Sequence, residues 1–156
     1  MRTTQDIRNY PKANDSKQMR PTYENSDSLK AEEQTISKVA EVWKSTYVKL
    51  PIQYRVDWAL LRGGVVAWCE CKRRYNNKDK YPTLMLSLNK IIHGMELARA
   101  TDKPFLVVVE WNDVVGWHKV EKVHGIRMGG RVDRGDWQDI EPVVHIPVTD
   151  FKQLTK

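Results

Sequence analysis

Three ionisable side chains between residues 57 and 72 have the types and the spacing that metal-assisted hydrolysis requires. Asp57 lies thirteen positions before Glu70, and Lys72 follows Glu70 at the second position. Glu70 interrupts the otherwise apolar run of residues 65–71, where an unpaired charge in a buried strand would cost on the order of several kcal/mol. We therefore expect Glu70 to have a chemical role or a close partner.

The geometry of a β-hairpin should bring the three side chains together. Side chains alternate between the two faces of a strand, so Glu70 and Lys72 share one face. The Gly63-Gly64 pair suits a tight turn between the strand that carries Asp57 and the strand that carries Glu70. Counting outward from that turn, Asp57 pairs with Glu70 or with its neighbour.

Two carboxylates and an ammonium at one place favour a bound divalent cation, because close carboxylates repel each other unless a cation or a shared proton intervenes. Oxygen ligands suit Mg²⁺ or Mn²⁺, which polarise phosphoryl oxygens and acidify bound water. The backbone carbonyl of Cys71 is a natural further ligand, and Lys72 would stabilise developing negative charge. The alternative is a surface ion pair between Glu70 and Lys72, worth under about 1 kcal/mol, which must then explain the interrupted apolar run.

The apolar pattern predicts a mixed order of helices and strands. Amphipathic stretches with apolar residues at helical spacing alternate with apolar or alternating runs that are typical of strands. The expected elements are a helix from about residue 28 to between 47 and 50, strands over 52–61 and 65–72, a helix over 83–101, and strands over 104–111, 114–123 and 143–148. This order predicts an α/β or α+β fold, with a mixed β-sheet flanked by helices.

Length and polarity together predict one domain preceded by a polar arm. The chain has 156 residues, enough for one hydrophobic core and too few for two comfortable ones. Residues 1–27 are polar and charge-mixed, so we expect a flexible arm that is held at a few points such as Tyr10 and Tyr23. Residues 28–156 should form the folded domain.

The series Asp57, then Glu70-Cys71-Lys72, resembles the D…(D/E)-x-K signature of the PD-(D/E)XK nuclease superfamily, although Val56 stands where some members have proline. That superfamily includes restriction endonucleases and junction-resolving enzymes of phages and archaea. The resemblance covers about residues 28–120 and implies a restriction-endonuclease-like core of a helix, a three-stranded meander, a second helix and a further strand. It implies that Asp57 and Glu70 bind Mg²⁺ or Mn²⁺ and that Lys72 assists the attacking water.

The first helix in that superfamily often carries a glutamate that faces the metal. The segment AEEQTI offers Glu32 and Glu33. We prefer Glu33, because it lies three residues before the core residue Ile36, and we expect it to assist through a second metal site or a metal-bound water. The choice between Glu32 and Glu33 stays open.

The segment after Lys72 is a candidate surface for nucleic acid. Within residues 72–80 five side chains are basic and one is acidic, and the net charge of the whole chain is +6. Basic side chains contact phosphates, and aromatic rings stack on bases. The candidate contacts are Arg73, Arg74, Tyr75, Lys78 and Lys80, with a plain solvated loop as the alternative. Ser87 and Lys90 could face the site from the second helix, but a structural or surface role is favoured for both.

Several function classes are disfavoured by the composition. No run of 18 apolar residues is present, so we expect no membrane span, and the first twenty residues lack the apolar region of a secretory signal. Cys69 and Cys71 lie two apart, a spacing that would strain a disulfide within one strand, so we expect reduced thiols and a cytoplasmic protein, in the host cytoplasm if it is viral.

The sequence therefore predicts a metal-dependent nuclease that hydrolyses phosphodiester bonds in DNA. The small size and the lack of a separate sequence-reading domain favour a structure-selective or weakly sequence-specific endonuclease of phage type. The resemblance also allows a homodimer, since many small members of the superfamily act as dimers. The alternatives are a non-catalytic nucleic-acid-binding module that keeps the fold, and an accessory interaction protein in which the Glu70–Lys72 pair is structural.

Overall fold

Two α-helices and nine strands make up the part of the chain that the computed structural model describes, residues 26–123, 125–130 and 140–155. Three short 3₁₀ helices, at Ile52–Tyr54, Lys78–Lys80 and Val148–Asp150, lie in its connections. The order is α1 (Ser26–Val42), β1 (Thr46–Lys49), β2 (Trp58–Leu61), β3 (Val65–Arg73), β4 (Thr83–Ser87), α2 (Leu88–Thr101), β5 (Phe105–Glu110), β6 (Val115–Lys119), β7 (Ile126–Gly130), β8 (Ile140–Pro147) and β9 (Lys152–Gln153).

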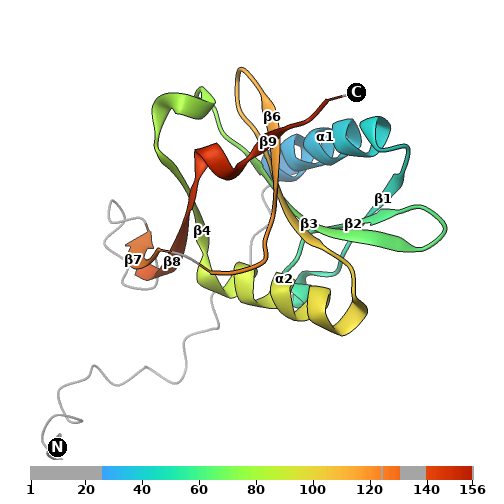
Figure 1. Cartoon of the computed structure of the whole chain (residues 1–156). Helices are drawn as coiled ribbons and strands as arrows, with labels where there is room; N and C mark the ends of the chain where they lie inside the picture. Colours follow the sequence, from blue (N-terminus) through green and yellow to red (C-terminus); the bar gives the residue numbers. More distant parts are fainter. Residues whose placement is uncertain (1–25, 124, 131–139, 156) are drawn as a thin grey trace, which may run out of the picture.

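The central layer is a mixed six-stranded sheet in the order β1-β2-β3-β5-β6-β9. Strands β1, β2 and β3 form an antiparallel meander, β5 lies parallel to β3, and β6 and β9 continue antiparallel. Helices α1 and α2 lie on opposite sides of this sheet, and a second sheet, β4-β8-β7, stands beside it (Figure 1). The predicted α/β fold with a mixed sheet between helices is confirmed.

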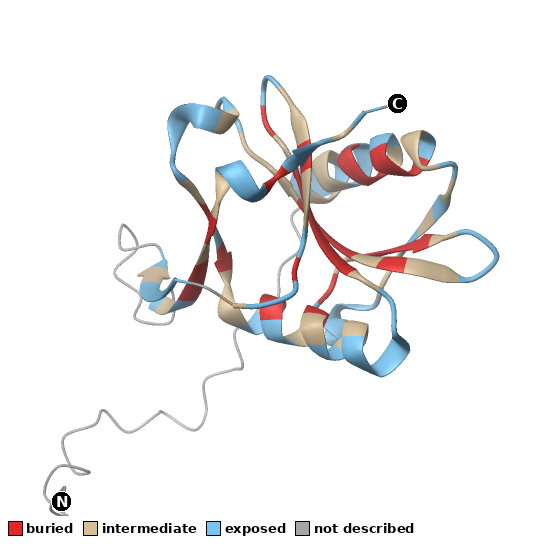
Figure 2. Ribbon diagram, in the orientation of Figure 1, coloured by how far each residue is buried: buried red, intermediate tan, exposed pale blue. Residues whose placement is uncertain are grey.

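The two faces of β3 and β5 have separate cores, because alternating side chains enter different layers. Cys69, Cys71 and Val108 pack beneath α1, whereas Val107 and Val109 belong to the core on the α2 side. Figure 2 shows the buried residues concentrated in these central strands and on the inward sides of the helices. Glu70 lies in the middle of this apolar layer and is fully buried.

The first helix ends earlier than the sequence predicted, and the strand β1 follows it. The chain leaves α1 through Lys44, whose φ of 48° is left-handed, and the Ser45 amide donates a hydrogen bond to the Ala40 carbonyl. Such a termination satisfies a helix-end carbonyl and turns the chain sharply. Residues 46–49, expected at the end of the helix, therefore form the first strand of the meander.

Two further predicted boundaries are wrong. Residues 52–54 form a 3₁₀ helix instead of a strand, because the loop from Leu50 to Asp57 is closed by a hydrogen bond from the Leu50 amide to the Asp57 carbonyl. Residues 83–87 form β4 instead of the first turn of a helix, since pairing with β8 buries Leu84 and Leu86. The second helix therefore begins at Leu88.

Most of the predicted arm lies outside the described residues, including Tyr10 and Tyr23. Ser26 and Asp27, which were assigned to the arm, belong to α1. Among the described residues, neither α1 nor α2 is long and apolar enough to cross a membrane. Cys69 and Cys71 are free and buried, as predicted, and burial raises the pKa of both thiols well above the usual range.

Helix α2 contacts the sheet closely at Gly94. A methyl group at this position would come within 2.3 Å of the Phe105 ring. Gly94→Ala normally favours a helix by about 1 kcal/mol, but here we expect a net loss of about 1 to 3 kcal/mol from overpacking. Urea denaturation measures the loss, and Phe105→Leu in the same chain should recover part of it. A Gly94→Ala protein as stable as the wild type would contradict the close packing.

Candidate active site

A β-bulge sets the register that brings Asp57 and Glu70 together. Leu61 pairs with Val65 beside the hairpin turn, but Leu60 pairs with Ala67, so β3 contains one extra residue at this point. The ladder then ends at the pair Trp58–Cys69. Asp57 directly precedes β2 and therefore stands opposite Glu70, as the count from the turn predicted.

Glu70 carries its charge inside the protein and meets two ammonium groups. Its exposed fraction is 0%. Its Oε1 accepts a hydrogen bond of 2.7 Å from Lys90 Nζ and lies 3.2 Å from Lys72 Nζ. The side chains of Lys72 and Lys90 are 22% and 33% exposed, so each ammonium also reaches the surface. The buried charge is thus paired, which a buried carboxylate requires.

Asp57 is a poorly stabilised carboxylate in this cluster. Its Oδ1 lies 3.7 Å from Lys90 Nζ and 3.9 Å from Lys49 Nζ, both longer than a hydrogen bond. Burial raises the pKa of Asp57 to about 7, and the nearby negative charge of Glu70 adds to the rise, while the lysines oppose it. The carboxyl group of Asp57 therefore ionises less easily than that of an ordinary aspartate.

One oxygen of each carboxylate is buried without a partner. Asp57 Oδ2 and Glu70 Oε2 accept no hydrogen bond, whereas every ammonium contact involves the other oxygen of the pair. Buried polar atoms normally have partners, so two such oxygens on adjacent strands require either a proton shared between the carboxyl groups or a bound cation. Carboxylate oxygens are ligands that Mg²⁺ and Mn²⁺ accept, so this pair fits a divalent cation.

The carbonyl of Cys71 lies on the side of β3 that faces β2, beyond the last pair of the β2 ladder. The backbone groups of successive residues point to alternate sides of a strand. The Trp68 amide donates to Pro104 on the β5 side of β3, so the backbone groups of Cys71, three residues later, point to the β2 side. The β2 ladder ends at Cys69, two residues before Cys71. The Cys71 carbonyl is therefore not held by that ladder.

The oxygen ligands here would not form a complete cage by themselves. Within the described ranges, no three or more His, Cys, Asp or Glu groups gather as a ready metal site. Mg²⁺ commonly takes only one or two protein carboxylates and fills its other positions with water and phosphate. Two carboxylate oxygens and one carbonyl match that habit.

Glu32, and not Glu33, reaches the cluster from α1. Glu32 Oε1 lies 3.9 Å from Lys72 Nζ, and burial, followed by the charge of Asp57, raises the pKa of Glu32. Glu33 is exposed and accepts a hydrogen bond of 3.3 Å from the Tyr47 hydroxyl instead. The sequence analysis preferred Glu33 as the residue that faces the site, but in the structure Glu32 lies beside Lys72 and Glu33 does not.

The helix stripe explains this difference. Thr35 is completely buried, but a threonine is not an apolar residue and was left out of the predicted core stripe. Including Thr35 rotates the centre of the stripe towards Glu32, which precedes Thr35 by three residues. The signal was therefore present in the sequence, in a residue type that usually prefers the surface.

Lys90 lies in the cluster, although the sequence analysis did not favour it as a site residue. A structural or surface role was favoured for Lys90, whereas its ammonium contacts Glu70. The buried residues of α2 are Ile91 and Gly94, and Lys90 lies one turn before Gly94 on that inward side. Ser87 behaves as favoured, because its hydroxyl donates to Glu141 at 3.2 Å and not to the cluster.

The arginines of the predicted nucleic-acid loop are partly occupied by the protein itself. Arg73 donates to the Glu110 carbonyl at 3.1 Å and to Asn112 Oδ1 at 2.9 Å. Arg74 lies 3.5 Å from the Met85 carbonyl, and burial lowers the pKa of its guanidinium. These contacts tie the end of β3 to neighbouring strands.

The rest of the loop differs in exposure. Lys78 donates to the Phe151 carbonyl at 3.1 Å, which anchors the loop beneath the chain end. Lys80 is exposed, and Tyr75 is 77% exposed although the guanidinium of Arg73 lies over its ring. Tyr75 and Lys80 therefore have the most freedom to contact a ligand.

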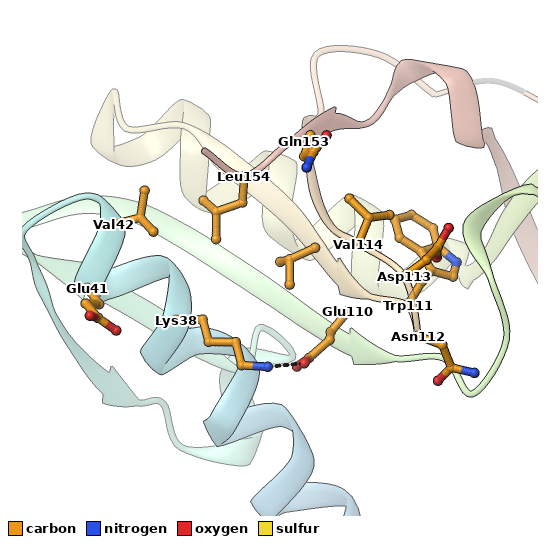
Figure 3. A pocket seen from close by; sticks show the side chains of 11 residues that line it. Lys38, Glu41, Val42, Glu110, Trp111, Asn112, Asp113, Val114, Gln153 and Leu154 are labelled. Atoms are coloured by element: carbon orange, nitrogen blue, oxygen red, sulfur yellow. Dashed lines mark hydrogen bonds and ion pairs between the residues drawn. The ribbon is translucent and has the colours of Figure 1, made fainter. Parts of the chain in front are cut away.

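A separate open pocket lies between α1, the turn after β5 and β9 (Figure 3). Its only prominent ion pair joins Lys38 to Glu110, and Thr35 donates to the other Glu110 oxygen at 2.7 Å. Both oxygens of Glu110 are thus satisfied, unlike those of Asp57 and Glu70. This pocket has no orphaned group that would require a ligand, so the cluster around Glu70 is the stronger candidate.

Comparison with known protein families agrees with this geometry. Residues 18–154 match the model of a family described as "Phage putative PDDEXK endonuclease". The chain belongs to this family. Membership places it among PD-(D/E)XK nucleases, as the spacing of Asp57, Glu70 and Lys72 predicted.

Among solved structures, the chain is similar to Hjc of Archaeoglobus fulgidus, a Holliday junction resolvase from an archaeal hyperthermophile. The TM-score is 0.54 at 14% sequence identity, and the match covers 80% of this chain and 92% of that chain. At this identity the likeness shows a shared fold. No curated protein matches the chain.

The raised pKa of Asp57 makes the metal-free protein sensitive to pH. Because the pKa in the folded state, about 7, exceeds the usual value near ~3.9, the folded state holds the proton more tightly. This stabilisation is complete below about pH 4 and is lost as the pH rises through about 7. The Asp57→Asn variant has no carboxyl group to ionise at this position, so it should not lose stability there as the pH rises. It should be more stable than the wild type by about 1 to 4 kcal/mol at pH 8 and by less at pH 5.

Urea denaturation in EDTA at both pH values measures this difference, since the groups shared by the two proteins cancel. Asp79→Asn, at an exposed aspartate of the basic loop, is the matched control and should show no such trend. A stability difference that does not grow from pH 5 to pH 8 would contradict the account of Asp57.

Proposed function

We propose that the chain hydrolyses phosphodiester bonds in DNA with Mg²⁺ or Mn²⁺ as its cofactor, and that Asp57, Glu70 and Lys72 are its catalytic centre. The observation that carries the proposal is the pair of buried, unpartnered oxygens, Asp57 Oδ2 and Glu70 Oε2, beside the ammonium of Lys72. Family membership supports nuclease chemistry. The finer assignment of metal, substrate and residue roles is the proposal.

The cation would be held by the two orphaned carboxylate oxygens and the Cys71 carbonyl. A divalent cation there supplies Lewis-acid polarisation of a phosphate oxygen and a more acidic water. The protein contributes the fixed arrangement of the oxygens, because two adjacent strands and their register set the position of each carboxylate. The fully buried Glu70 is held between ammonium groups, so little reorganisation is needed on binding.

Lys72 has the contacts expected of a residue that faces the reacting phosphate. Its ammonium lies 3.2 Å from Glu70 Oε1 and 3.9 Å from Glu32 Oε1, and the side chain is partly exposed. From this position Lys72 can donate to a phosphate oxygen and stabilise the charge that develops during hydrolysis. Glu32, with its raised pKa, can accept a proton from the attacking water or orient that water.

The proposed substrate is branched DNA, or DNA that is cut with little sequence preference. The net charge of +6 favours a polyanion, and the exposed Tyr75 and Lys80 lie in the connection that follows the strand of Glu70 and Lys72. The structural relative Hjc is a Holliday junction resolvase. A homodimer of this chain would place one cluster on each of two DNA strands.

Glu70→Gln should abolish cleavage without unfolding the protein. The amide keeps the volume of the side chain but removes the charge that a cation requires, so cleavage of plasmid and branched DNA in Mg²⁺ should fall by about a thousandfold or more. Binding of the same DNA in EDTA should persist. Glu121→Gln, in an exposed ion pair with Lys119, is the control and should cleave normally. Metal-dependent cleavage by a folded Glu70→Gln protein would overturn the proposal.

The two neighbouring glutamates of α1 provide a matched pair. Glu32→Gln should slow cleavage by about 10- to 100-fold, because it removes an acceptor beside Lys72. Glu33→Gln should leave the rate nearly unchanged, since Glu33 contacts Tyr47 at the surface. Single-turnover cleavage of a labelled duplex compares the two variants. A larger loss in Glu33→Gln than in Glu32→Gln would reverse the assignment.

A further inference from the structure

Lys90 contacts both carboxylates of the cluster, although it is not part of the D…(D/E)-x-K signature. Its ammonium approaches both carboxylates at once, 2.7 Å from Glu70 Oε1 and 3.7 Å from Asp57 Oδ1. It comes from α2, on the opposite side of the sheet from α1, which contributes Glu32. Lys90 therefore links the two carboxylates from a helix that follows them in the chain.

The ammonium contacts divide the oxygens of the cluster into two sets. Lys72 and Lys90 both lie on Glu70 Oε1, and Lys90 also lies nearest Asp57 Oδ1. The other two oxygens have no partner. A first divalent cation can bind the unpartnered set without displacing any ammonium, whereas a second cation would have to share Glu70 Oε1 with two positive charges.

The charge balance leads to the same conclusion. Three carboxylates, Asp57, Glu70 and Glu32, face three ammonium groups, those of Lys49, Lys72 and Lys90. Even when all three carboxyl groups are ionised, these six side chains sum to no net charge, so the cluster has no excess negative charge before any metal binds. One divalent cation already makes it net positive, and a second would meet repulsion at a few ångströms in a partly buried place.

We propose that Lys90 is a positioning residue that restricts the site to one divalent cation and fixes Glu70 as a ligand through Oε2 alone. This inference rests on the proposed function, since it concerns the same cation. Lys90 occupies the place at Glu70 Oε1 that a second cation would need. It also lowers the affinity for the first cation, because its positive charge lies on the same carboxylates.

Binding of Mn²⁺ to the full chain without DNA tests the proposal, with calorimetry for affinity and the paramagnetic signal of free Mn²⁺ for the count. The wild type and Lys90→Arg should bind one Mn²⁺ per chain. Lys90→Met, which keeps the apolar stem without the charge, should bind the first Mn²⁺ at least about threefold more tightly and take up a second one in the millimolar range. Its DNA cleavage should nevertheless fall, because Glu70 loses the contact that orients it.

Opposite changes in affinity and cleavage separate this role from a merely structural one, since a disturbed fold would weaken both. Lys103→Met removes an exposed lysine after α2 and should leave the count and the affinity unchanged. If Lys90→Met does not fold, Lys90→Gln serves in its place. One Mn²⁺ at unchanged or weaker affinity in the neutral variant would overturn the inference and leave the proposed function standing. Absence of Mn²⁺ binding to the wild type would overturn the proposed function itself.

Discussion

The buried negative charge of Glu70 is the constraint on which the rest of the site depends. A carboxylate with no solvent access must be compensated, and two neighbouring elements supply that compensation. Strand β3 supplies Lys72 and helix α2 supplies Lys90, whereas Asp57, directly before β2, adds a second negative charge that increases the need for positive charge. One unpartnered oxygen on each carboxyl group distinguishes the cluster from a simple salt bridge, and the proposed cation would bind these two oxygens.

The fold can hold this charged cluster with a modest loss of stability, because the two sides of the sheet differ in polarity. The side of the sheet beneath α1 is almost wholly apolar, with Cys69, Cys71 and Val108 in contact with the helix. The other side has an apolar core with the charged cluster at one place in it. Most buried side chains on both sides of the sheet therefore lie outside the charged cluster, so the fold can tolerate two close carboxyl groups.

The sequence predicted the centre of this molecule better than its edges. Glu70, Lys72 and the partner strand of Asp57 could be placed because alternation and a hairpin turn are local rules, and β5 was recognisable as an apolar run. Strand β1 and the start of α2 could not be placed, because strand pairing overrode helical spacing: β1 pairs with the next strand, β2, and β4 pairs with the distant β8. The same limit applied to Glu32 and Lys90, whose role depends on the direction in which each helix crosses the sheet.

The extra residue in β3 beside Leu60 has a consequence for how such a hairpin can change. If the pairing of Leu61 with Val65 continued without the bulge, Asp57 would stand opposite Cys69, whose side chain enters the layer under α1. A single deletion near the hairpin turn would thus move the side chains of one strand to the opposite face of the sheet relative to the other strand. Asp57 and Glu70 would then be separated, although the sequence would still contain both. Insertions or deletions in this hairpin are therefore tolerable only when they change a strand by an even number of residues, so that each side chain keeps its face of the sheet.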